Sequence, residues 1–102
     1  MKKVNYISEA IRNIREMFKT GGFIGLDKDY SYWLIVWNNG EETIVDNGTV
    51  AYGGLPKMSA RKIREIRSWF SGGPQGGYCY EEIYRKDSHK YIDKMTGETI
   101  ER

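Results

Sequence analysis

Apolar residues recur at three- and four-residue steps near the start of the chain. Over residues 5–19 six of them fall on one side of a helical wheel: Ile7, Ala10, Ile11, Ile14, Met17 and Phe18. Such a stripe predicts an amphipathic helix that buries this side. Asn5 or Ser8 is a suitable cap for its start, and the Gly21-Gly22 pair ends it.

A pattern of aromatic and β-branched residues follows. Residues 30–37 predict a β-strand, and Asn39-Gly40 predicts a type I′ hairpin turn, whose two central residues both need positive φ angles. The return strand is expected over residues 42–45. A second Asn-Gly pair then turns the chain into a strand over residues 49–52. Together these segments predict a three-stranded antiparallel meander.

Helix-like spacing returns after Pro56. Ser59 is a plausible N-cap for a second amphipathic helix that runs through Phe70. Its apolar side would consist of Met58, Ile63, Ile66, Trp69 and Phe70. The Gly72-Gly73-Pro74 sequence ends this predicted helix.

The last third of the chain again favours strands. Residues 78–86 predict one strand, and residues 91–100 predict a hairpin with Gly97 at the position that favours positive φ. The element order is then α-β-β-β-α-β-β-β. We therefore expect one α+β domain over residues 1–102, with a mostly antiparallel sheet of five or six strands and two amphipathic helices on one face.

Composition agrees with a folded protein of the cytoplasm. Apolar residues make up 39% of the chain and charged residues 29%, which is an ordinary balance for a globular domain. The single cysteine, Cys79, excludes an intrachain disulfide, so the chain needs no oxidising compartment. No apolar stretch is long enough to span a membrane, and the first residues lack the apolar region of a signal peptide.

The chain offers few groups for catalysis. Cys79 falls in a predicted strand without a helix N-terminus to activate it, and His89 falls in a polar turn, where we expect a surface histidine. Two such residues are too few for a zinc site of cysteine and histidine alone. The glycine-rich residues 72–77 follow a predicted helix rather than a strand, so they do not fit a phosphate-binding loop. We expect no enzyme activity, no cofactor and no metal.

Positive charge is concentrated in the second predicted helix. Glu65 is the only acid set against its five cations, which are Lys57, Arg61, Lys62, Arg64 and Arg67. A face of this kind is able to neutralise phosphates, to meet an acidic protein surface, or simply to stay solvated. The sequence leaves these three interpretations open.

Tyrosines gather on one predicted strand. Tyr78, Tyr80, Glu82 and Tyr84 project from the same strand face. Exposed aromatics on a sheet stack bases in several RNA-binding modules, but the neighbouring glutamates would repel phosphate. This combination favours a protein partner, for which tyrosine supplies rigid contact area. A solvated strand face is the plainer alternative.

We therefore expect a small non-enzymatic protein-binding module. Its size, tight turns and lack of a catalytic set are typical of accessory proteins of phages and mobile elements, including inhibitors that occupy the surface of a host defence or nucleic-acid-processing complex. The alternative is a nucleic-acid-binding protein that uses the basic helix, and a homodimer stays open. The candidate partner-binding residues are Lys57, Arg61, Lys62, Arg64, Arg67, Tyr78, Tyr80, Glu82 and Tyr84. Which sheet face Trp33 and Trp37 occupy cannot be decided from the pattern alone.

Overall fold

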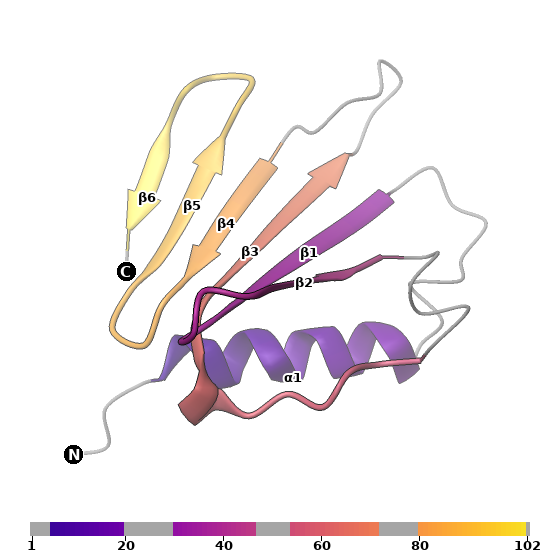
Figure 1. Cartoon of the computed structure of the whole chain (residues 1–102). Coiled ribbons are helices and arrows are strands. Elements are labelled where there is room, and N and C mark those ends of the chain that lie inside the picture. Colours follow the sequence, from indigo (N-terminus) through magenta and orange to yellow (C-terminus); the bar gives the residue numbers. More distant parts are fainter. Residues whose placement is uncertain (1–4, 20–29, 47–53, 72–79, 102) are drawn as a thin grey trace.

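One α-helix lies across one face of a six-stranded antiparallel sheet, as Figure 1 shows for a computed structural model of the chain. The structure describes residues 5–19, 30–46, 54–71 and 80–101. The sheet order is β2-β1-β3-β4-β5-β6. Its elements are α1 (Tyr6–Lys19), β1 (Tyr30–Trp37), β2 (Glu42–Val45), the 3₁₀ turn η1 (Ala60–Lys62), β3 (Ile63–Ser71), β4 (Tyr80–Tyr84), β5 (His89–Asp93) and β6 (Thr99–Glu101).

The first helix is confirmed, and its apolar stripe supplies four of the ten residues of the buried core. Ile7, Ala10, Ile11 and Ile14 are all buried against the sheet. Of the two suggested caps, Asn5 is used, because its Oδ1 accepts hydrogen bonds from the backbone N–H of Ile7 at 3.0 Å and of Ser8 at 3.3 Å. These bonds fix where the helix begins.

The prediction of a second helix from Ser59 through Phe70 is wrong. Its residues form the short turn η1 and then β3, which lies between β1 and β4 in the sheet. Ser59 precedes η1 but makes no capping hydrogen bond with its side chain. Intrinsic helix propensity contributes only a small free energy per residue. Hydrogen bonding to a strand on each side, together with burial in the sheet, stabilises the strand conformation more strongly.

A β-bulge explains why this strand has helix-like spacing. Val36 pairs with Glu65 but the next residue, Trp37, pairs with Ile63, so Arg64 is an extra residue in β3. The bulge lets Ile63 and Ile66 face the same side although they are three residues apart, and both are fully buried. A three-residue step between apolar residues is therefore produced here by an irregular strand.

The first hairpin forms where Asn39-Gly40 predicts it, but not with the predicted turn. Gly40 has a φ of 91°, whereas no described residue other than glycine has a positive φ, so the type I′ turn is wrong. The loop instead has three residues. The Gly40 N–H donates to the Trp37 carbonyl and the Trp37 N–H donates to the Glu41 carbonyl, both at 2.9 Å. Asn39 Oδ1 accepts a hydrogen bond from the Glu41 N–H at 2.9 Å, which stabilises this longer loop.

The C-terminal strands agree broadly with the prediction. β4 lies within the predicted residues 78–86, and β5 and β6 form the predicted hairpin, in which Gly97 has a φ of 79°. The predicted strand at residues 49–52, the glycine-rich residues 72–77 and Tyr78 lie outside the described residues.

The core lies between α1 and the sheet. Trp33, Ile35, Val45, Ile63, Ile66 and Tyr84 point toward the helix and are at most 2% exposed. This settles the placement of Trp33, which is buried, while Trp37 is half-buried at the margin of the core. The structure is thus a small α+β domain with its helix on one face of the sheet.

Candidate functional site

The five cations of residues 57–67 do not share one face. Lys57 precedes η1, Arg61 and Lys62 belong to it, and Arg64 and Arg67 belong to β3. The guanidinium of Arg64 is bound within the fold, because its Nη2 donates to the Asn38 carbonyl at 2.9 Å. The structure therefore does not gather these residues into a single basic surface.

The described tyrosines of β4, Tyr80 and Tyr84, project from the face of the sheet that α1 covers. Tyr84 is 2% exposed and belongs to the core, so a partner cannot contact its ring in this fold. Tyr80 is half-buried and stacks on Tyr91 with a centroid distance of 5.6 Å. Tyr78 lies outside the described residues.

Glu82 is the centre of a polar cluster beside the core. His89 Nε2 lies 3.0 Å from Glu82 Oε1, and Glu82 Oε2 accepts hydrogen bonds from the Tyr84 hydroxyl at 3.0 Å and the Ser68 hydroxyl at 3.5 Å. His89 is 3% exposed, so the expectation of a surface histidine is wrong. Its ring stacks on Tyr84 at 4.1 Å. Burial, together with the nearby Glu82 carboxylate, raises the pKa of Tyr84 far above its ordinary value.

The cluster has catalytic residue types, but three of its four residues, Ser68, Tyr84 and His89, are almost fully buried. Ser68 is 0% exposed, and a nucleophile or a general acid must come within hydrogen-bond distance of the group on which it acts. We therefore interpret the cluster as structural. Within the described ranges, no group of three or more His, Cys, Asp or Glu residues is arranged to hold a metal ion.

The other face of the sheet, here called the open face, is not covered by any helix among the described residues (Figure 1). The strand register places on it an unusual number of large apolar side chains. Six are half-buried and one, Ile44, is 41% exposed. The half-buried ones are Tyr32, Leu34, Val36, Trp69, Ile83 and Ile92.

An ion-pair network crosses the middle of the open face. Glu65 pairs with Arg67 Nε at 2.7 Å and with Arg85 Nε at 2.8 Å. Glu81 pairs with Lys94 Nζ at 3.2 Å and with Arg67 Nη1 at 3.7 Å. Burial would raise the pKa of Glu65, but the hydrogen bonds and charges of the two arginines outweigh burial and lower it.

The two signs of charge lie at different depths in this network. The side chains of Glu65 and Glu81 are only 10% and 12% exposed. The cations above them are much more exposed, at 37% for Arg67, 45% for Lys94 and 60% for Arg85. The exposed charges in the middle of the open face are therefore cations, whereas two exposed acids, Glu42 and Glu101, lie on the outer strands β2 and β6.

A second candidate surface is a groove between α1 and residues 54–62, here called the basic groove. It consists of three adjoining hollows. Trp37 and Lys62 line both the first and the second hollow, and Arg15 and Leu55 line both the second and the third. The central hollow, of about 570 Å³, is also lined by Pro56, Lys57, Met58 and Ser59. Cations of α1 and of residues 54–62 thus meet along one groove.

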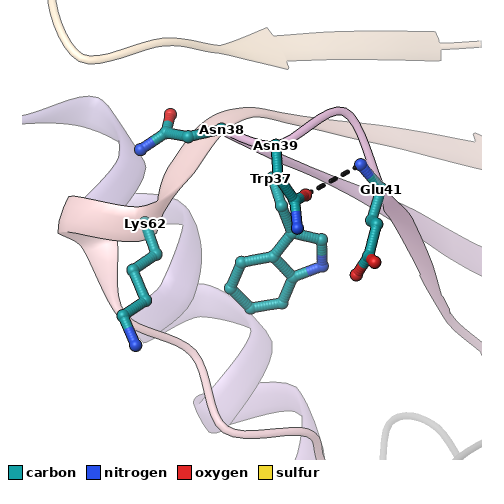
Figure 2. Close-up of a pocket in the computed structure, with 5 residues that line it drawn as sticks. All are labelled: Trp37, Asn38, Asn39, Glu41 and Lys62. Carbon is teal, nitrogen blue, oxygen red and sulfur yellow. Dashed lines mark hydrogen bonds between the residues drawn. The ribbon is translucent and has the colours of Figure 1, made fainter.

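Trp37 occupies the end of the groove at the first hairpin. Figure 2 shows its indole ring with Lys62 on one side and Glu41 on the other. The ring orientation is fixed because the indole Nε1 donates to Thr43 Oγ1 at 2.8 Å. An aromatic ring held in this way is a suitable surface for a flat ligand, and the neighbouring lysine is able to bind an anionic group.

Comparisons of this sequence with protein-family models, with curated proteins and with solved structures find no match. No described helix combines the length and the apolar character needed to cross a membrane. The function is therefore inferred from the open face and the basic groove.

The sequence contained one signal for the open face. Residues 30–37 are apolar on both strand faces, which is expected only when both faces are covered. Arg85 and Lys94 were not identified, because their pairing with buried carboxylates depends on the register of three strands. Trp37 was not identified either, because its role depends on contacts with distant residues such as Lys62.

Proposed function

We propose that this protein is a non-enzymatic protein-binding module and that the open face is its contact surface. The observation that carries this proposal is the arrangement of the ion-pair network: buried acids, exposed cations, and large apolar side chains on both sides. A sheet face that only meets water normally carries mostly polar residues. An exposed apolar face that also carries arginines is instead typical of a protein interaction site.

The charge of the face indicates the chemistry of the partner. Arg85, Lys94 and Arg67 have their carboxylates beneath them and their outer sides toward solvent. A partner with an apolar patch bordered by aspartates or glutamates would complete these pairs. Tyr32 and Trp69, whose rings meet edge to face at 5.3 Å, would provide a rigid aromatic contact at the centre.

A second copy of this chain fits the open face less well. A two-fold dimer centred on this face would bring the exposed cations of the ion-pair network close to those of the second copy. Such juxtaposition of like charges is unfavourable. A different protein is therefore the proposed partner, and occupation of its surface would give the inhibitory role expected from the sequence.

Charge reversal at neighbouring positions tests this proposal. Arg85 lies on the open face, whereas Lys86 is exposed in the following turn and lies on neither candidate surface. The wild-type protein and the Arg85→Glu and Lys86→Glu variants would each be immobilised and used to capture proteins from cell lysate. We expect Arg85→Glu, but not Lys86→Glu, to lose a captured acidic protein that binds the wild type stoichiometrically.

A second variant separates binding from folding. Ile44→Asp changes an exposed residue on the apolar side of the open face and leaves the ion-pair network intact. We expect it to fold, as judged by circular dichroism, and also to lose the captured protein. Capture that is equal for all of these variants would contradict the proposal, and so would a captured protein that is lost only with Lys86→Glu.

A further inference from the structure

We propose that the basic groove binds single-stranded nucleic acid, with one base stacked on Trp37 and the phosphates bound by Arg15, Lys57 and Lys62. This site is distinct from the open face and does not depend on the function proposed for it. It also differs from the basic helix expected from the sequence, because Arg15 comes from α1 and Trp37 from β1.

The first observation is positive charge without matching acids. Among the described residues, the side chains that line the groove include five cations and two carboxylates, whereas the whole chain has a net charge of only +2. No carboxylate of the described ranges lines the central hollow. Within the part of the chain that the structure describes, no ion pair joins Arg15, Lys57 or Lys62 to an acid. These cations are therefore available to phosphates.

The second observation is the ring of Trp37 beside these cations. Leu55, Pro56 and Met58 extend the apolar surface of the central hollow. Each nucleotide carries one flat base and one negative charge, which matches a groove with an aromatic ring at one end and cations along its length. An acidic peptide would also satisfy the cations, but its side chains need not include a flat ring. The aromatic ring thus favours nucleic acid.

The ligand is proposed to be single-stranded because stacking on Trp37 needs an exposed base face. In a duplex the base faces are covered by neighbouring base pairs. Asn39 lines the same hollow, and although its Oδ1 accepts the Glu41 N–H, its amide NH₂ group suits an acceptor on the edge of a base (Figure 2). The Asn38 amide instead donates to the Arg61 carbonyl at 2.8 Å.

Fluorescence anisotropy of a labelled oligothymidine with the full-length protein tests the site. If three cations bind phosphates, the logarithm of the affinity should fall with the logarithm of salt concentration with a slope of about −2. Lys57→Gln combined with Lys62→Gln should lower the affinity at least about ten-fold and make the slope shallower. Lys86→Glu changes the net charge by the same amount outside the groove and should leave the affinity within about two-fold.

Substitution of Trp37 tests stacking separately from charge. Trp37→Ala should lower the affinity about ten-fold without changing the salt slope, and Trp37→Phe should restore part of the loss because a ring remains. Circular dichroism would confirm that each variant is folded. If Trp37→Ala does not fold, the comparison of Trp37→Phe with the wild type at constant salt replaces it.

Four results would overturn the proposal. The first is no binding at low salt, and the second is an equal loss of affinity in the groove double variant and in Lys86→Glu. The third is that a duplex of the same length binds as tightly as the single strand. The fourth is that a glutamate-rich peptide binds to the groove in preference to the oligonucleotide. The last result would assign the groove to an acidic protein segment instead.

Discussion

At the scale of single residues, each face of the sheet has a glutamate that binds several neighbouring side chains. Glu65 on the open face is bound by the guanidinium groups of Arg67 and Arg85, and Glu82 on the helix side is bound by His89 and by hydroxyl groups. Both carboxylates are mostly buried, and a buried carboxylate is tolerated only when its oxygens are paired. Sequence alone suggested neither environment, because both partner sets come from different strands.

The pairing of Glu65 makes stability depend on pH. Its pKa in the folded protein lies below the ordinary value of 4.5, which it regains in the unfolded chain. The stabilisation is therefore complete above the unfolded pKa and is lost as the pH falls through the lower, folded pKa. We expect the melting temperature of the wild type to exceed that of Glu65→Gln near neutral pH.

Thermal melts of the two proteins from neutral to acidic pH would measure this effect. The difference between their melting temperatures should be constant above about pH 6 and should shrink as the pH falls below 4.5. A difference that is as large in acid as at neutral pH would show that the charge of Glu65 does not stabilise the fold.

At the scale of elements, the helix α1, the first hairpin and the C-terminal hairpin could be predicted from the sequence. Each depends on local signals: an apolar stripe, or a glycine at a position with positive φ. β3 could not be predicted, since the bulge at Arg64 spaces Ile63 and Ile66 like residues of a helix. In addition, the polar Ser68 is buried and the apolar Trp69 is half-exposed. The sequence therefore lacks the alternation of buried apolar and exposed polar residues that is expected of a strand.

The first hairpin provides a test at this scale. Gly40 has a φ of 91° with open space around it, so an added methyl group meets no neighbour but forces the backbone into an unfavourable region. Gly40→Ala should lower the free energy of unfolding by about 1 kcal/mol. Gly40→Asn should cost less, because asparagine tolerates positive φ better than alanine.

Urea unfolding of the three proteins would measure these differences. Equal stability of the wild type and Gly40→Ala would contradict the turn geometry. A larger loss for Gly40→Asn than for Gly40→Ala would also contradict it.

At the scale of the whole molecule, the fold separates two surfaces. The open face lies on the side of the sheet away from α1 (Figure 1). The basic groove is on the other side, where residues of α1 line it together with residues 55–59. The sequence indicated some of the residues that form the two surfaces, namely cations within residues 57–67 and a strand that is apolar on both faces. It did not indicate how they combine, because the cations divide between the two surfaces only once residues 63–71 form a strand.

The central claim is that the open face contacts another protein, and site-specific photo-crosslinking tests it most directly. A photoreactive amino acid would replace Ile44 on the open face or, as the matched control, Lys86 in the exposed turn, and the full-length protein would be irradiated in cells that produce it. We expect the variant at position 44 to give one dominant crosslinked product with a different, acidic protein, and the variant at position 86 to give none. Equal products at both positions, or no product at position 44, would contradict the claim.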